Sequence, residues 1–281
     1  MAAFAIEDIE LKSTETNTLD LSIQISANGF SYSYYQRNTN KYLGIYHIPA
    51  INDTVKLLSF FEEQKHLRNS EFAKVRIVYC TPECTIIPAV LFNENDTDKI
   101  FNLSFGNAMK RKPLASYLPT SRNYMIFGIP EKLNDYLNFA FPGKLIYTQA
   151  ALFVDYGFTR HLLNNDKPLH TIFADVYGDY FSVMLLENEK LLLFNTFRYK
   201  SANDIVYYIL SVFNQYKLDQ AKTHCSFSGF IEKDSIAIIQ LRKFVQFVFF
   251  EGRNTHFNYC YRFQEVPAHM FYNFLNIVEC E

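Results

Sequence analysis

Apolar residues on alternate positions mark the first strands of the chain. Leu and Ile alternate with polar residues over 19–25, and Phe and Tyr do so over 30–34. Asn28-Gly29 stands between the two segments, and this dipeptide readily supplies the positive φ of a hairpin turn. Residues 42–48 can form a third strand. The pattern therefore predicts an antiparallel meander of three strands.

A change to helical spacing follows this meander. Residues 52–54 offer an N-cap, and Val55, Leu58 and Phe61 then recur at the spacing of one helix face. Residues 75–79 return to a β-branched, apolar composition that predicts another strand. The order of the first half is strand, strand, strand, helix, strand.

The second half of the chain repeats this order. Ser201 and Asp204 have the spacing of a capping box, and the apolar residues from Ile205 to Tyr216 form one buried stripe. Both first turns contain glycine, Gly29 and Gly178. The elements of the second half are strands over 169–176, 180–186 and 191–195, a helix over 201–216 and a strand over 223–227. A repeat of roughly 150 residues is too long for a solenoid unit and predicts a duplicated α/β domain.

The remaining segments define the predicted domains. Residues 1–17 are polar and unpatterned, so we expect an irregular or disordered N-terminus. We expect a first domain over 18–163 and a second over 164–281, with the last helix packing back on the first domain. The further elements are helices over 130–141, 148–163, 234–244 and 267–278, the last with Met270, Phe271, Phe274, Leu275 and Val278 on one side, and strands over 124–128 and 245–250.

Composition narrows the possible partners. The chain has 281 residues with a formal net charge of −2, so it has no positive field for nucleic acid. The apolar run over 245–250 is far too short to span a bilayer, and no basic signal sequence opens the chain. The five cysteines are scattered and predict free thiols in the cytoplasm, with no paired spacing for a metal site. The 28 Phe and 20 Tyr exceed ordinary core needs, so we expect an aromatic patch for a protein partner as well.

Tandem βββαβαβ units are the signature of the actin-like ATPase (ribonuclease-H-like) superfamily. Residues 173–180, followed by 191–197, resemble its second phosphate hairpin. From about Leu19 to Val278 the chain also resembles an uncharacterised bacterial family with this fold, of which the platform proteins of pilus and type II secretion machines would be distant relatives. The residues that carry this likeness are 21–30, 195–197, 204–208 and Ser228-Gly229. The resemblance implies the fold and no established activity.

The superfamily's first phosphate hairpin differs in this sequence at both functional positions. It requires an Asp that orders the magnesium shell and a Gly whose amide approaches phosphate. Gln24 occupies the Asp position, and Ser26 occupies the Gly position. Because glutamine has no charge with which to hold a hydrated cation, this part of the nucleotide site is absent.

The other two nucleotide-binding devices are partly retained. Asp175 and Gly178 remain in the second hairpin, but Tyr177 stands where a glycine should admit the triphosphate. In the superfamily a Gly-Gly pair forms the floor of the adenine pocket. Here the pair is reduced to Gly229-Phe230, and the Phe230 ring could block the pocket or stack on a base. For Asp175 the alternative is a turn residue bonded to its own backbone, and for the glycines it is turn geometry alone.

The resulting hypothesis is a non-catalytic, actin-like interaction or scaffold protein with no catalytic residues, no metal and no cofactor. Its partner would be another protein, and it would not insert into membranes. The alternative is a divergent ATP-binding protein or kinase. In that case Asp175, Gly178 and Gly229 would be vestigial cofactor-binding residues, and ATP with magnesium would be the ligand.

Overall fold

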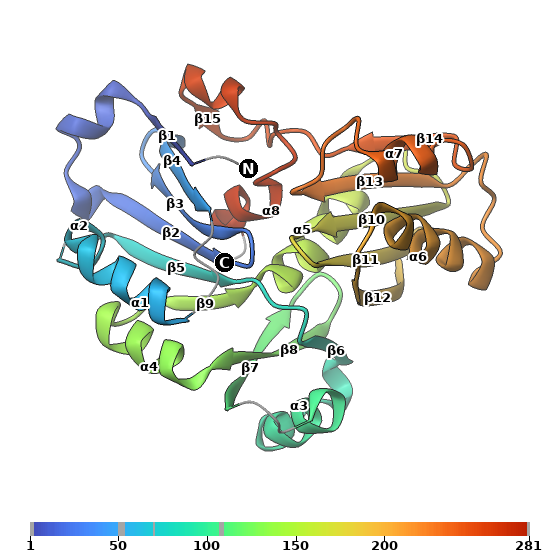
Figure 1. Ribbon diagram of the computed structural model, residues 1–281, viewed down its shortest axis with the longest axis horizontal. Coiled ribbons are helices and arrows are strands. Elements are labelled where there is room, and N and C mark those ends of the chain that lie inside the picture. The colour runs from blue at the N-terminus through green and yellow to red at the C-terminus, as the bar shows by residue number, and fades with distance from the viewer. Residues whose placement is uncertain (1–2, 50–53, 70, 107–109, 280–281) are drawn as a thin grey trace.

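The computed structural model describes residues 3–49, 54–69, 71–106 and 110–279. Two sheets of similar design lie side by side, each with helices on one face, and a smaller sheet projects from the first half (Figure 1). Among the described residues no helix is long and apolar enough to cross a membrane.

The two large sheets share one strand order. Each begins with an antiparallel meander, and its first strand then pairs in parallel with the strand that follows the helix. The first sheet has the order β1 (Phe4–Glu7), β4 (Lys41–Pro49), β3 (Gly29–Gln36), β2 (Leu19–Ser26), β5 (Lys74–Tyr79), β9 (Leu145–Thr148). The second has β12 (Lys190–Arg198), β11 (Tyr180–Glu187), β10 (His170–Val176), β13 (His224–Gly229), β14 (Phe247–Phe250). The predicted duplicated actin-like fold class is confirmed.

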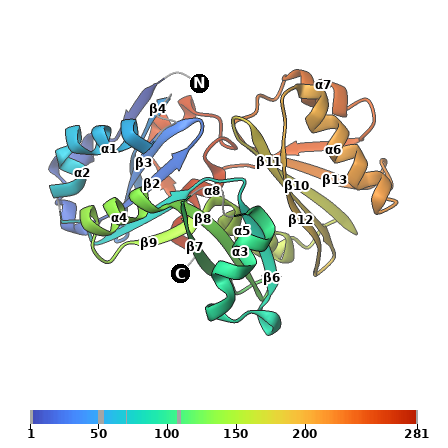
Figure 2. The same cartoon turned by 60° about the horizontal axis from the view of Figure 1, so that its bottom comes forward.

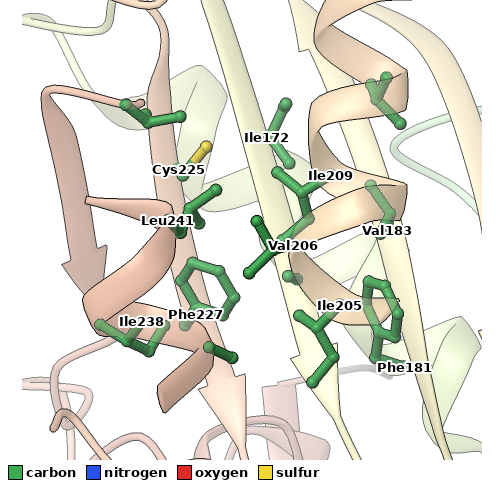
Figure 3. Packing of buried hydrophobic residues seen from close by; sticks show 14 of the residues in the cluster. Ile172, Phe181, Val183, Ile205, Val206, Ile209, Cys225, Phe227, Ile238 and Leu241 are labelled. Atoms are coloured by element: carbon green, nitrogen blue, oxygen red, sulfur yellow. The ribbon is translucent and has the colours of Figure 1, made fainter. Parts of the chain in front are cut away.

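Helices cover one face of each large sheet. On the first sheet Leu21 and Ile23 point toward α1 (Thr54–Glu63) and α4 (Glu131–Ala140) and share a core with their residues Phe61 and Leu137; α2 (Lys65–Asn69) follows α1. On the second sheet α6 (Ala202–Gln215) and α7 (Ile236–Leu241) bury Ile209 and Ile238 against β10 and β13 (Figure 3). The predicted capping box opens α6, since the Ser201 amide N–H donates to Asp204 Oδ2 at 2.9 Å.

Helix α5 (Gln149–Leu163) lies between the two sheets and is buried along most of its length. Leu152 joins the core beside the first sheet, and Phe153 and Val154 join a cluster with Met184 of β11. A helix that is apolar on nearly all sides is expected in the interior. It therefore connects the halves and packs against both.

The small sheet was largely missed by the sequence reading. Its order is β6 (Cys84–Pro88), β8 (Asn123–Pro130), β7 (Arg111–Leu118), with α3 (Thr97–Phe105) beside β7 and β8 (Figure 2). Only β8 shows a clear apolar run. β7 tolerates Pro113 because it is an edge strand, and that proline and the neighbouring lysine hide its pattern.

Two predictions about the chain ends are wrong. Residues 4–7 form strand β1, which pairs with β4, and residues 9–13 and 16–18 form short 3₁₀ helices. The strand was not recognised because Ile6 is its one buried side chain. The closing helix over 267–278 is reduced to α8 (Tyr272–Leu275) and a 3₁₀ turn at Ile277–Glu279. The polar Asn273 and Asn276 are buried there as well as the predicted apolar side chains, so contacts on several sides, and not one apolar stripe, determine this segment.

The last part of the chain returns to the first sheet. Strand β15 (Asn258–Tyr259) pairs with β4, and the Tyr42 hydroxyl donates to the Leu275 carbonyl. Phe263 and Phe274 are buried there with Tyr42 in one apolar cluster. This C-terminal segment therefore covers the sheet face opposite α1 and α4.

Candidate functional site between the two hairpin turns

The hairpin turns of the two sheets identify equivalent positions. The β2–β3 ladder closes at Ser26, and the β10–β11 hairpin closes at Tyr177, whose amide N–H donates to the Tyr180 carbonyl at 2.9 Å. Two residues before these points lie Gln24 and Asp175. The fold thus confirms the equivalence of the two hairpins on which the sequence argument depends.

The Gln24 side chain lies buried at the first of these positions. It is 2 % exposed, and its Nε2 has no hydrogen-bond partner among the described residues. A neutral amide supplies no charge for a divalent cation. The described residues also contain no group of three or more His, Cys, Asp or Glu side chains placed to hold a metal ion.

The Asp175 carboxyl is also buried, but it is ionisable. It lies within strand β10 and accepts a 2.8 Å hydrogen bond from Ser228 Oγ on the adjacent strand β13, while Oδ2 has no partner among the described residues. Burial raises its pKa to about 7, and the hydrogen bond from Ser228 opposes this rise. The expected turn residue bonded to its own backbone is therefore wrong. Asp175 links two strands.

A direct bond joins the two turns. The Gly178 amide N–H donates to Asn28 Oδ1 at 2.8 Å, so a side chain of the first hairpin occupies the acceptor position for the second. In a nucleotide site that amide would face a phosphate oxygen. Gly178 has no positive φ, and an added Cβ would meet only the Asn28 side chain at 3.6 Å. Turn geometry therefore does not require this glycine.

Gly229 is required by the backbone around it. Its φ is +85°, and an added Cβ would lie 2.3 Å from the Val176 carbonyl oxygen and 2.9 Å from Asp175 Oδ1. Its amide N–H donates to the His269 carbonyl at 2.8 Å. The donor that could approach a ligand is therefore already used by the C-terminal segment.

Aromatic rings fill the space next to these turns. Tyr177 is 3 % exposed and stacks on Tyr180 with ring centroids 5.3 Å apart. Phe230 lies 5.9 Å from the Tyr177 ring, 5.3 Å from Phe271 and 5.6 Å from His47 of the first sheet. Of the two roles expected for Phe230, the packed ring fits a blocked pocket.

The site can hold the two halves together through the protein's own groups. The sequence located Gln24, Asp175, Tyr177, Gly178 and Gly229. The fold brings Gly229 next to Asp175 and joins Gly178 to the first hairpin, whereas Gln24 lies at the equivalent position of the other sheet. The sequence did not identify Asn28 or Ser228 as partners, or His269 and Asn273 as contributors from the C-terminal segment. Asn28 was recognised only as a turn residue, because nothing local shows that its side chain crosses to another hairpin.

Comparisons with known proteins agree with this fold. A family model described as a protein of unknown function, DUF3822, matches residues 8–248. A protein of unknown function with an actin-like ATPase fold from Bacteroides thetaiotaomicron is 23% identical, with 95% of this chain and 97% of that chain covered and a TM-score of 0.80. The PilM–PilN type IV pilus biogenesis complex gives 11% identity, 93% and 98% coverage and a TM-score of 0.60. A search of curated proteins finds no match.

Proposed function

The chain belongs to the DUF3822 family and has an actin-like fold. We propose that it is a non-catalytic interaction protein. In this proposal the two hairpin turns hold the halves of the molecule together, and the protein acts by binding another protein. The observation that carries the proposal is the hydrogen bond from the Gly178 amide to Asn28 Oδ1 at 2.8 Å. A phosphate would have to displace this bond before it could contact the same amide.

The surrounding groups oppose nucleotide binding further. A triphosphate would require a cation to offset its charge, and Gln24 offers none of the charge that would hold one. The ring of Tyr177 is buried and stacked on that of Tyr180, so admitting a ligand would break an aromatic stack and expose apolar surface. Any favourable contact with the ligand would first have to offset the uncompensated phosphate charge and the loss of this packing.

Exposed apolar side chains in the segment between β6 and β7 are the surface that we propose for a protein partner. Val90 is 91 % exposed, Leu91 69 % and Leu103 89 %. Large exposed apolar patches mark protein interaction sites, and in this proposal these side chains form one. The solved PilM structure, similar in fold, is a complex with the protein PilN. A protein partner is therefore the class of ligand that we propose for this chain.

Thermal unfolding with and without magnesium-ATP tests whether the site between the two hairpin turns binds nucleotide. A ligand at about 100 times its dissociation constant stabilises a protein by about 2.7 kcal/mol, which is readily measured. We expect millimolar magnesium-ATP to leave the melting temperature unchanged. Calorimetric binding in the micromolar range that is abolished by Asp175→Ala would overturn the proposal and favour the ATP-binding alternative.

Affinity purification with matched variants tests the partner. We expect the wild-type chain to recover one protein in stoichiometric amount from lysate of its source cells, and Val90→Asp/Leu91→Asp to lose it. Ile236→Asp is the control, because Ile236 is 65 % exposed on α7 of the other half. Recovery that all variants share equally would reject this surface, and repeated recovery of no protein would reject the interaction role.

A further inference from the structure

A cavity of about 580 Å³ lies on the face of the second sheet opposite α6 and α7. The C-terminal end of α5 and strands β10, β13 and β14 surround it, and the loop after β14 closes one side. Its volume lies within the range of about 300–1,000 Å³ typical of small-molecule sites. None of the hairpin-turn site residues Asn28, Asp175, Tyr177, Gly178 or Gly229 lines it, so it is a separate site.

Two groups of opposite charge line this cavity, Arg160 and Glu251. The described residues show no ion pair between them. Burial would lower the pKa of Arg160, but Tyr272, Tyr156 and Glu251 together raise it, so the guanidinium remains charged. Glu251 accepts a 2.5 Å hydrogen bond from Ser226 Oγ, which fixes one carboxylate oxygen on the sheet. The cavity therefore presents a cation and an anion, and the two charges act on each other electrostatically.

Polar groups with unused hydrogen-bonding capacity adjoin the charges. His161 is 4 % exposed and Thr171 is 5 % exposed, and both side chains line the cavity. His161 Nε2 and Thr171 Oγ1 have no hydrogen-bond partner among the described residues. Burial lowers the pKa of His161, so its ring is neutral at pH 7. A polar ligand in the cavity would give such groups the partners that buried polar atoms ordinarily have.

Aromatic rings form part of the remaining wall. Phe173 of β10 and Phe249 of β14 line the cavity, and the ring of His224 lies 5.0 Å from that of Phe249. Burial lowers the pKa of His224, which keeps this wall uncharged at pH 7. The site thus combines a charged end with an apolar side, an arrangement that suits a ligand with a polar head and an apolar body.

We propose that this cavity binds a small zwitterion, namely a free α-amino acid with an apolar side chain. The ligand carboxylate would pair with Arg160, its ammonium group with Glu251, and its side chain would lie against Phe173 and Phe249. A simple anion would leave Glu251 facing it unpaired, and a simple cation would face Arg160. A zwitterion is the class that matches both charges at once.

A thermal-shift panel of the twenty amino acids, each at 10 mM on the full chain, tests this proposal. We expect at least one apolar member to raise the melting temperature, by about 2–4 °C for each kcal/mol of binding. N-acetylation or carboxyl amidation of that amino acid should abolish the shift. Arg160→Gln and Glu251→Gln should each weaken calorimetric binding by about tenfold or more, since each removes a hydrogen bond to a charged group.

Arg242→Gln and Glu232→Gln change the same charges outside the cavity and serve as matched controls. The melting temperature of each variant without ligand shows whether it has folded. A panel in which no amino acid shifts the wild-type chain overturns the proposal. So does binding that survives either cavity variant, or binding of the acetylated and amidated forms with equal affinity.

Discussion

Two buried carboxylates on equivalent strands of the two sheets are neutralised in different ways. Asp20 of β2 accepts hydrogen bonds from Arg76 and Arg37, both at 2.9 Å. Asp175 of β10 accepts one from the uncharged Ser228, and burial raises its pKa to about 7. In the first half, arginine side chains offset the charge of the buried carboxylate. In the second half, which has the same topology, a bound proton does so.

The segments that cover one face of each large sheet also differ between the two halves. The C-terminal segment closes the free face of the first sheet, where Phe263 and Phe274 are buried. The corresponding face of the second sheet is covered in part by α5 and retains the cavity next to Arg160 and Glu251. Strand order therefore sets the positions of these groups, while the segments that cover each face decide what they can bind.

Removing the cation from the first sheet should have the largest effect. Arg76 and Asp20 are fully buried, so Arg76→Leu leaves a buried carboxylate with half of its partners. We expect a loss of about 3 kcal/mol in urea unfolding, near the lower end for breaking a buried pair. Arg37→Leu removes the half-exposed partner of the same carboxylate and should cost about 1 kcal/mol or less. Equal losses would show that the buried Arg76 stabilises this carboxylate no more than the half-exposed Arg37 does.

Gly229→Ala should come next, because its Cβ would meet the Val176 carbonyl oxygen at 2.3 Å in a backbone with φ of +85°. We expect a loss of about 2–3 kcal/mol in the free energy of unfolding. Gly143→Ala is the matched control, since Gly143 has φ of +74° and open space around it, and it should lose only about 1 kcal/mol. Similar losses at both positions would mean that φ alone matters and that close packing around Gly229 does not.

Asp175→Asn should change the pH dependence of stability. An unfolded Asp ionises near pH 4, whereas Asp175 holds its proton up to about pH 7. Its contribution to stability is therefore complete below about pH 4, is lost as pH rises through 7, and changes little above that. The full difference is at most about 4 kcal/mol, from about 1.4 kcal/mol per pKa unit. The stability of Asp175→Asn relative to that of the wild type should therefore rise between pH 5 and pH 8.

Urea unfolding at pH 5, 6.5 and 8 measures this gain. Asp219→Asn is the control, because it removes a carboxylate that is 51 % exposed. Its free energy of unfolding should change with pH in parallel with that of the wild type over the same range. If the Asp175→Asn curve were also parallel, the carboxyl would be ionised throughout. The contrast with Asp20 would then fail.

The sequence predicted those features that depend on local pattern. Alternation from 19 to 25 located β2, and the capping box at Ser201 located α6. The equivalence of Gln24 and Asp175 followed from two such hairpins. These signals are local because a strand or helix shows its buried face in its own side chains.

Features that depend on distant partners were not predictable in this way. Strand β1 has one buried side chain, and α8 is buried on every side, so neither has a periodic face. The acceptor role of Asn28 and the cavity between α5 and β14 arise only when distant segments meet. A single sequence contains no signal for such pairings.

The smallest expected effect is that of Asn28→Ala. It removes an exposed hydrogen bond between the two turns, and a neutral bond of this kind contributes about 1 kcal/mol. We expect that loss in urea unfolding, and we expect magnesium-ATP still to leave the melting temperature unchanged, because Gln24 and Tyr177 are untouched. Asn38→Ala, in an exposed turn of the first half, is the control and should be nearly silent. If Asn28→Ala alone opened the chain to nucleotide, the asparagine bridge would be the barrier, and the missing carboxylate at Gln24 would not be.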